Sequence, residues 1–370
     1  MRLFLCGDVM TGRGIDQALP HPVNPVLYEP YVRDAREYLQ LAEKAHAPIQ
    51  RPLSFDYIWG DALQELDRAE VDLRIANLET AVTSAETPWP GKGIHYRMHP
   101  QNIGCLSAAH ISACSLANNH VLDWGYDGLT ETLQTLNAAG IAYSGAGNDA
   151  DEAIQPAVLN TTGKGRVLLF SFGSTTSGIP SGWKATSISP GVNLLDDLSE
   201  ATATRVCDQM RAHQQQGDLI VASIHWGSNW GNEITREQIV FAHRLIEQGI
   251  AIVYGHSSHH VRAIEVFKGR LILYGCGDFL TDYEGISGYP AAAGFRGDLA
   301  LIYLVELDSD NGELINARLV PMQMRRFRLE RRSAADAKWL CNLLNALGKP
   351  FGTALRSQED NSLKLEWREE

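Results

Sequence analysis

Residues that can bind metal ions follow five short apolar segments of this 370-residue chain. In chain order they are Asp8; Asn77 and Glu79; Asn118, Asn119, His120 and Asp123; His225; and His256, His259 and His260. Carboxylate oxygens and imidazole nitrogens together suit Mn, Fe or Zn, and a pair of such ions can clamp a phosphoryl group and activate water. If the segments meet in space, this set predicts a metal-dependent hydrolase of phosphoesters.

Each of these residues also has a plainer interpretation when it is taken alone. Asp8 and the pair Asn118-Asn119 are of types common in turns, and histidines grouped as at 256–260 also occur in surface loops. The metal-site interpretation therefore depends on all five segments delivering their side chains to one place.

The apolar segments have strand length and alternate with helix-like segments. The strand-like segments are 2–7, 73–76, 111–117, 166–172, 219–224, 250–254 and 270–274, and the helix-like ones are 32–45, 55–69, 126–138, 199–215 and 233–248. This alternation predicts an α/β architecture with a largely parallel sheet, whose strands end along one edge where ligands bind. The continuously apolar run 219–224 is typical of a central strand that is covered on both faces.

The C-terminal part of the sequence is richer in strand signals. Segments 299–307 and 314–320 flank the turn pair Asn311-Gly312 and predict a hairpin. A helix over 333–347 with Ser333 as its N-cap follows, and 357–370 is expected to be a frayed tail. We therefore expect a main domain over 1–330 and a C-terminal helix and tail over 331–370. The Ser-, Thr-, Gly- and Pro-rich segment 173–191 is expected to be a functional or mobile loop.

Composition excludes several classes of protein. With 32 Lys and Arg against 44 Asp and Glu, the net charge is −12, which disfavours nucleic acid as a partner. The six cysteines are scattered, as expected for reduced core thiols. No apolar run reaches the roughly 18 residues of a membrane span, and Asp8 comes too early for a signal peptide. We expect a cytoplasmic protein, and the sequence does not indicate its oligomeric state.

Read in order, several short motifs resemble the CapA family, which is named for capsule and poly-γ-glutamate synthesis. The motifs are Gly7-Asp8-Val9-Met10-Thr11-Gly12-Arg13, Asn77-Leu78-Glu79, Ala117-Asn118-Asn119-His120 with Asp123, His225-Trp226-Gly227 with Glu233, and Gly255-His256-x-x-His259. That family resembles a branch of the calcineurin-like metallophosphoesterase superfamily. The similarity covers residues 1 to about 327, and it implies a four-layer α/β sandwich in which helices flank two mixed sheets.

The resemblance also implies a site with two divalent metal ions. By analogy with the superfamily, Asp8 and His259 would bind the first ion, and Glu79 would bridge the two ions. Asn119, His225 and His256 would bind the second ion. His120 would protonate a leaving alkoxide or hold a phosphate oxygen, and Asp123 would orient His120 by accepting its other ring proton.

The sequence departs from the superfamily pattern at three positions. Met10 stands where a ligand histidine is usual, so the first ion would have one ligand fewer. Glu79 has a longer arm than the usual aspartate. Asp278, in Gly277-Asp278-Phe279, stands where the family often has asparagine, and it is a possible ligand that would compensate for Met10.

The candidate substrate contacts are Arg13, Arg97, Asn118, Glu233 and Asp278. Arg13 is suited either to clamp an anion bidentately or to form a structural salt bridge. Arg97, between His95 and His99, is expected to line the substrate pocket. Trp226 and Trp230 fit either rim packing or a platform for an apolar or sugar-like group. The basic cluster at 325–332 fits a solvated strand edge or a contact with an acidic polymer.

Three functions remain open from the sequence. The first is a metal-dependent phosphoesterase acting on a small or polymer-linked anionic substrate. The second is a non-catalytic component of a surface-polymer synthesis machine. The third is a metal-dependent amide hydrolase, for example of glutamyl polymers, because an activated water serves either bond.

Overall fold

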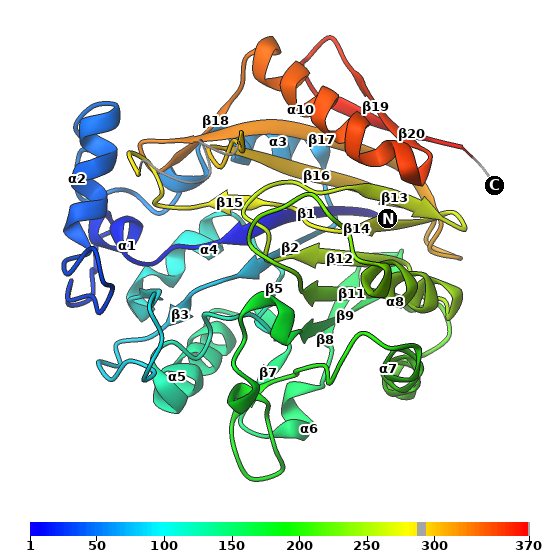
Figure 1. Ribbon diagram of the computed structural model, residues 1–370, viewed down its shortest axis with the longest axis horizontal. Helices are drawn as coiled ribbons and strands as arrows, with labels where there is room; N and C mark the ends of the chain where they lie inside the picture. The colour runs from blue at the N-terminus through cyan, green and yellow to red at the C-terminus, as the bar shows by residue number, and fades with distance from the viewer. Residues whose placement is uncertain (287–293, 369–370) are drawn as a thin grey trace.

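The computed structural model describes residues 1–286 and 294–368. Its larger sheet has ten strands, and its main path runs β19-β20-β17-β16-β1-β2-β5-β6, with β15 paired to β1 and β18 paired to β17 (Figure 1). The bounds are β1 (Arg2–Val9), β2 (Leu73–Leu78), β5 (Ala113–Ser115), β6 (Ala142–Ser144), β15 (Asp278–Leu280), β16 (Leu299–Leu307), β17 (Leu314–Arg325), β18 (Arg328–Arg331), β19 (Thr353–Ser357) and β20 (Leu363–Trp367). Strands β15, β1, β2, β5 and β6 run parallel, whereas β16 is antiparallel to β1, so the sheet is mixed.

The second sheet has six strands in the order β13-β14-β12-β11-β9-β8. The bounds are β8 (Ala157–Thr161), β9 (Gly165–Gly173), β11 (Leu219–His225), β12 (Ile252–His256), β13 (Ile264–Phe267) and β14 (Arg270–Leu273). Its four central strands are parallel and its two edge strands are antiparallel. Two further pairs of short strands are β3 (Ala81–Val82) with β4 (Arg97–Met98), and β7 (Ala146–Gly147) with β10 (Gly191–Val192).

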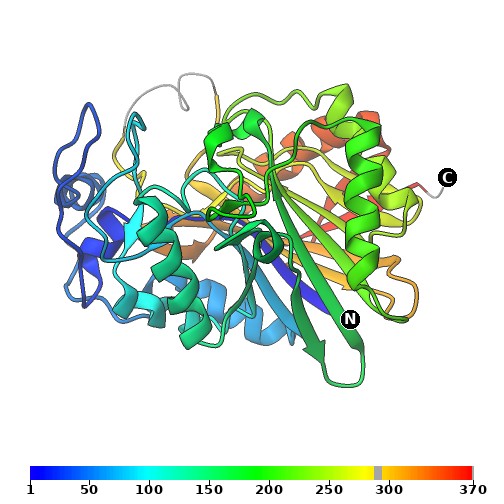
Figure 2. The ribbon, with the colours of Figure 1, turned by 90° about the horizontal axis from the view of Figure 1, so that it is seen from below.

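Helices flank the two sheets; most pack on their outer faces, whereas the last one, at 334–348, packs against the core between the sheets. They are α1 (Gly14–Ala18), α2 (Arg36–Ala45), α3 (Asp61–Ala69), α4 (Gly104–Ala108), α5 (Gly125–Ala138), α6 (Ala150–Ala153), α7 (Glu200–His213), α8 (Arg236–Glu247) and α10 (Ala334–Gly348), with short 3-10 turns η1 (Tyr57–Trp59), η2 (Pro100–Ile103), η3 (Thr175–Ser177), η4 (Ser181–Trp183) and η5 (Lys349–Phe351). Seen from below, α5 and α7 lie on opposite sides of the molecule with strands between them (Figure 2).

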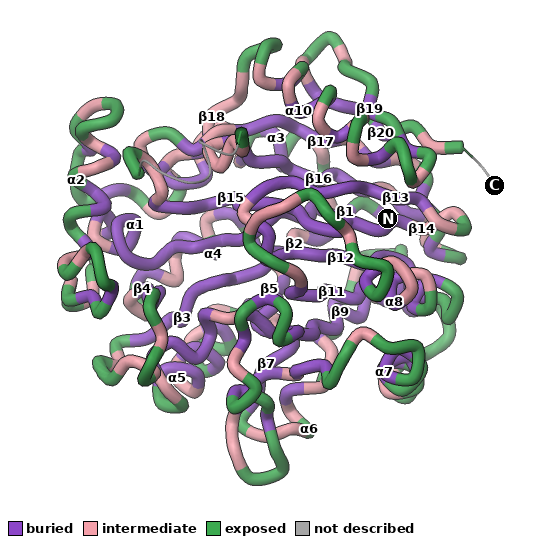
Figure 3. Tube along the Cα trace, in the orientation of Figure 1, coloured by how far each residue is buried: buried purple, intermediate pink, exposed green. Residues whose placement is uncertain are grey.

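Strand alternation explains how the layers pack. On β1, Phe4 faces the core shared with helices such as α3 and α5, whereas Leu3 and Leu5 face the core between the sheets. On β9, Leu169 faces the inter-sheet core, whereas Phe170 packs toward α7 and α8. The result is four layers, helices, sheet, sheet and helices, and the strands at the centre are buried along nearly their whole length (Figure 3). The expected α/β sandwich is confirmed, and β11 is the doubly covered strand that its apolar sequence predicts.

The C-terminal segment differs from the expectation. The predicted hairpin and the helix capped by Ser333 are present as β16, β17 and α10. The expectation of a frayed tail over 357–370 is wrong for the described residues, because β20 pairs with both β19 and β17. Leu363 and Leu365 point inward and are buried, which anchors the strand. The sequence shows this alternation over too few residues to separate an edge strand from a tail.

Other expectations concern the chain as a whole. All six cysteines are free and buried, as expected for core thiols. None of the helices in the described ranges combines the length and the apolar character that a membrane span requires. The basic cluster is largely neutralised in place, since Arg328 pairs with Asp61 and Arg332 pairs with Asp336.

Candidate metal centre

The strand register brings the candidate ligands of both sheets to one place. Asp8 at the end of β1 is aligned with Asn77 on β2 and with Asp278 on β15. In the second sheet, His225 at the end of β11 is aligned with His256 at the end of β12. Because the carboxyl ends of the parallel strands of both sheets face the same side, side chains distant in sequence converge there.

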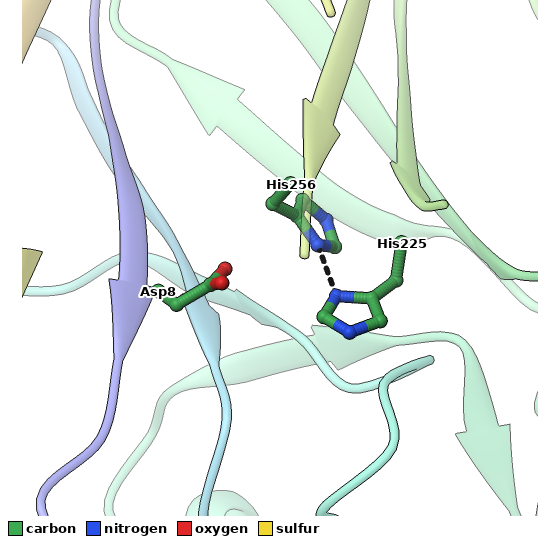
Figure 4. Close-up of side chains that lie close together, drawn as sticks. All are labelled: Asp8, His225 and His256. Carbon is green, nitrogen blue, oxygen red and sulfur yellow. Dashed lines mark hydrogen bonds between the residues drawn. The ribbon is translucent and has the colours of Figure 1, made fainter. Parts of the chain in front are cut away.

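One potential metal-binding group consists of Asp8, His225 and His256. A ligand atom from each lies within 4.8 Å of the others, and all are buried. The Asp8 carboxylate points across the gap between the sheets toward the two imidazoles (Figure 4). The Nδ1 atoms of His225 and His256 lie 2.7 Å apart, and Ser223 Oγ lies 2.7 Å from Nε2 of His256. The hydroxyl of Ser223 thus orients a ring on the neighbouring strand.

A second group consists of Asp8, His259 and Asp278, again with its ligand atoms within 4.8 Å of one another. Nδ1 of His259 lies 2.8 Å from Oδ1 of Asp278, and its Nε2 lies 3.1 Å from the amide nitrogen of Asn229. Asp8 is the residue common to both groups within the described ranges. The carboxylate of Asp8 therefore lies beside two potential metal positions.

Glu79 and Asn119 lie beside these groups. Oε1 of Glu79 is 3.8 Å from Nε2 of His120 and 3.9 Å from Nε2 of His225. Oδ1 of Asn119 is 3.1 Å from Nε2 of His225. The two residues expected to hold ions together with Asp8 and His225 therefore contact the same cluster.

The electrostatics of the cluster favour bound cations. Burial, followed by the nearby charge of Asp278, raises the pKa of Asp8 to about 7. Burial and the charge of Asp8 raise the pKa of Glu79 well above its ordinary value. Burial lowers the pKa of His256 to about 3. Burial thus favours the protonated form of the two carboxyls and the neutral form of the imidazole, and a divalent cation would offset this penalty on the carboxylates.

Two orphaned oxygens test whether a metal ion fits these residues. Oδ2 of Asp8 and Oδ2 of Asp278 are buried and have no hydrogen-bond partner among the described residues. A buried polar atom without a partner is costly unless something else satisfies it. Two such oxygens beside imidazole nitrogens form a set of hard and intermediate donors that suits Mn, Fe or Zn. The residues present therefore fit a divalent metal centre.

His120 lies at the edge of the cluster, and Asp123 and Tyr96 contact its ring. Its Nδ1 is 2.6 Å from Oδ2 of Asp123, so Asp123 contacts the imidazole as the sequence pattern suggests. Tyr96 packs edge-on against the ring at 4.6 Å between centroids, and its backbone N–H donates to Oδ2 of Asp123 at 2.6 Å. Burial lowers the pKa of His120 to about 4.

Sequence reasoning missed residues that support the ligands. Asn77 Nδ2 donates to Oδ1 of Asp8 at 2.8 Å, and Lys92 Nζ lies 2.5 Å from Oδ1 of Asp123. Asn77 was visible in the same motif as Glu79. Lys92 carries no signal, because it stands alone between two glycines in a polar loop. Met10 is buried with its sulfur 3.5 Å from the hydroxyl of Tyr283.

Two of the expected substrate contacts, Arg13 and Arg97, bind other groups of the protein instead. Arg13 is buried and forms a salt bridge with Asp282 and a second one with Glu29, at 2.5 and 2.9 Å, so the structural alternative is the one that the structure supports. Arg97 stacks over Trp124 with its guanidinium carbon 3.8 Å from the ring centre, and it donates to the backbone carbonyls of Ala85 and Asn24. Neither guanidinium is part of the ligand cluster.

The remaining candidates take different places. Asn118 holds its own turn, because its Oδ1 accepts from the N–H groups of His120 and Val121 at 3.1 Å. Glu233 is exposed, and its backbone carbonyl accepts from Arg262 at 3.5 Å. Asp278 lies in the cluster itself.

The neighbouring histidines and tryptophans are also accounted for. Nε2 of His95 lies 3.1 Å from the carbonyl of Trp89, and His99 caps η2 by accepting from the N–H of Gln101, so neither joins the ligands. Trp226 is buried and donates to the carbonyl of Tyr274 at 3.0 Å, as rim packing requires. The ring of Trp230 lies against His259 and His260, at 5.6 and 5.9 Å between centroids.

The sequence of this chain is similar to those of several known proteins. The family described as bacterial capsule synthesis protein PGA_cap matches residues 2–283. A protein of Mycobacterium tuberculosis named as a probable polyglutamine synthesis accessory protein is 43% identical over 364 residues, which cover 98% of this chain and 95% of that protein. The PGA biosynthesis protein CapA of Bacillus subtilis is 28% identical over 57% of this chain and 53% of its own length. The capsule biosynthesis protein CapA of Bacillus anthracis is 27% identical over 52% of this chain and 45% of its own length.

Proposed function

The chain belongs to the PGA_cap family of bacterial capsule synthesis proteins, as its motifs predict, and within that family we propose that it is a metal-dependent hydrolase with phosphoesterase-like chemistry. The observation that carries the proposal is the position of Asp8 in two buried ligand groups at once. A carboxylate shared in this way is the arrangement with which proteins hold two divalent ions.

The residues would divide between the two positions as follows. His225 and His256 would serve one position, and His259 and Asp278 would serve the other, with Asp8 common to both. Glu79 and Asn119, which contact His225, would be further ligands. Asp278 would thus supply the ligand that Met10 does not. When bound, two divalent ions, Mn, Fe or Zn, would supply Lewis acidity and an activated water.

His120 is the residue best placed to handle a proton. Because Asp123 is bonded to its Nδ1, the other ring nitrogen, Nε2, faces Glu79 and the ligand cluster. A ring held in this orientation can hold an oxygen of the substrate or deliver a proton to a leaving group at Nε2. The substrate class is a small or polymer-linked anion, since the cations of the site would attract negative charge.

A second candidate function follows from the relatives. The protein of Mycobacterium tuberculosis carries the name accessory protein. On that basis this chain would be a non-catalytic component of a surface-polymer synthesis machine, and its partners would be other proteins of that machine. A third candidate, hydrolysis of amide bonds in glutamyl polymers, uses the same cluster and differs only in substrate. A cytoplasmic location stays a prediction, to be checked by cell fractionation.

Elemental analysis and turnover assays separate these functions. We expect the purified protein, supplemented with Mn, Fe or Zn, to bind about two equivalents of metal and to hydrolyse bis(p-nitrophenyl) phosphate. Glu79→Ala should lose metal and turnover, whereas Glu37→Ala on the exposed face of α2 should retain both. Turnover of a γ-glutamyl anilide alone would favour the amide hydrolase. Metal without any turnover would favour the accessory role, and absence of metal binding would overturn the proposal.

A further inference from the structure

Lys92 lies behind the His120–Asp123 pair and belongs to none of the expected site motifs. Its ammonium is 2.5 Å from Oδ1 of Asp123, 3.1 Å from the carbonyl of Ile94 and 3.0 Å from Nδ1 of His120. Its side chain is 14% exposed, and Asp123 is fully buried. The buried carboxylate of Asp123 is thus paired with a lysine from a different loop.

The donor and acceptor roles of these groups determine which of them can accept a hydrogen bond from Lys92. An ionised carboxylate only accepts, so Nδ1 of His120, at 2.6 Å from Oδ2 of Asp123, must carry the proton. An ammonium also only donates, and it therefore cannot bond to that nitrogen. Lys92 donates instead to Asp123 and to Ile94, so its hydrogen bonds act on the imidazole through Asp123, although its charge also lies 3.0 Å from Nδ1.

Asp123 is also the anchor of the loop that carries Lys92. The backbone N–H of Trp89 donates to the carbonyl of Asp123 at 2.7 Å, and the N–H of Tyr96 donates to its Oδ2 at 2.6 Å. Lys92 stands between these two anchors, flanked by Gly91 and Gly93, where an added Cβ would meet open space. The Lys92 side chain is therefore the link that ties the tip of the loop to the carboxylate.

A second loop meets the first one at Lys92. The ammonium lies 5.5 Å from the ring centre of Trp183, and Trp89 packs edge-on against the same indole at 5.4 Å. Trp183 is fully buried. The aromatic contact restricts the directions in which the lysine can move, so the ammonium stays on Asp123.

We propose that Lys92 is a positioning residue, which fixes Asp123 and through it holds His120 with Nε2 toward the ligand cluster. This inference rests on the proposed function for its kinetic consequence, because His120 matters only if the site turns over a substrate. The positioning itself is a property of the protein alone. It can therefore be measured whether or not a substrate is known.

The kinetic test uses Lys92→Met, which keeps the length of the side chain and removes the charge. We expect kcat to fall by about 10–100-fold, as for other partners of site residues, while KM and metal content stay unchanged. Lys92→Arg should restore most of the loss. Lys184→Met is the matched control, because Lys184 is exposed in the adjoining loop and forms its ion pair with Asp196, away from Asp123. Combined with Asp123→Asn, Lys92→Met should add little, since both act on one contact.

The structural test is nuclear magnetic resonance of the imidazoles in the metal-loaded protein. The hydrogen-bonded Nδ1–H of His120, assigned by its absence in His120→Gln, should be weakened or shifted in Lys92→Met and unchanged in Lys184→Met. If this signal and kcat both match the wild type, the inference is overturned. A raised KM with an unchanged signal would make Lys92 a substrate contact and would also overturn it. A shifted signal in a protein without turnover would support the positioning and reject the proposed function alone.

Discussion

Asp8 and Asp278 are direct neighbours across the parallel strands β1 and β15, and both carboxylates lie beside His259. The charge of Asp278 adds to burial in raising the pKa of Asp8 to about 7. Two buried acids at one point are unfavourable unless protons or cations balance them. Under the proposed function, Asp278 would supply from a different strand the ligand that Met10 does not.

Substitutions at the two acids should have unequal effects on metal content. Asp8→Asn removes a ligand from both groups, and we expect it to lose nearly all bound metal. Asp278→Asn removes a ligand from one group only, so it should retain about one equivalent. Elemental analysis after dialysis measures this, with Asp208→Asn on the exposed face of α7 as the control. Equal losses in the two variants would contradict a shared Asp8.

In the metal-free protein, the contribution of Asp8 to the stability of the fold should depend on pH. Its folded pKa of about 7 lies above the ordinary value near 3.9, so the native state binds the proton more tightly. The contribution of Asp8 to stability is therefore fully present below about pH 4 and is lost as pH rises toward 7 and above. We expect the melting temperature of Asp8→Asn, relative to the wild type in chelator, to increase between pH 5 and pH 8. A pH-independent difference would contradict the raised pKa.

Removal of the buried Arg13 charge should destabilise the fold. In Arg13→Met, Asp282 and Glu29 lose their cation inside the protein, and we expect a loss of about 3–5 kcal/mol in the free energy of unfolding. Arg36→Met, which breaks an exposed pair with Asp34, should cost far less, because solvent screens that pair. Urea unfolding compares the two. A fully stable Arg13→Met with a raised KM would instead indicate an anion clamp.

The last described strand should contribute to stability. Leu365 is 2% exposed and packs in the core between the sheets, so Leu365→Ala should cost about 2–5 kcal/mol. Lys364→Ala, one residue earlier on the exposed face of β20, should change stability by less than about 0.5 kcal/mol. Thermal unfolding of both variants measures the contrast. Similar melting temperatures for the two would fit a frayed tail rather than a paired strand.

The candidate site was visible in the sequence to the extent that it depends on strand ends. Asp8, His225 and His256 each end an apolar run of strand length, and parallel strands place such ends along one edge. The pairing of Lys92 with Asp123 was not visible, because it joins two loop residues that no periodic pattern relates. The state of Arg13 was left open for a similar reason: a guanidinium fits an anion or a buried acid equally well until its neighbours are known.

By itself, the sequence determined the α/β class, the strands that carry the ligands, the family and the chemical types of the donors, because hydrophobic period and residue type are local properties. The tertiary structure alone decided which donors share a position. It placed Asp8 in both ligand groups, brought Asp278 in from β15, and joined Lys92 to Asp123. These relationships depend on the register between strands and on the packing of loops, which are set by contacts between segments far apart in the chain.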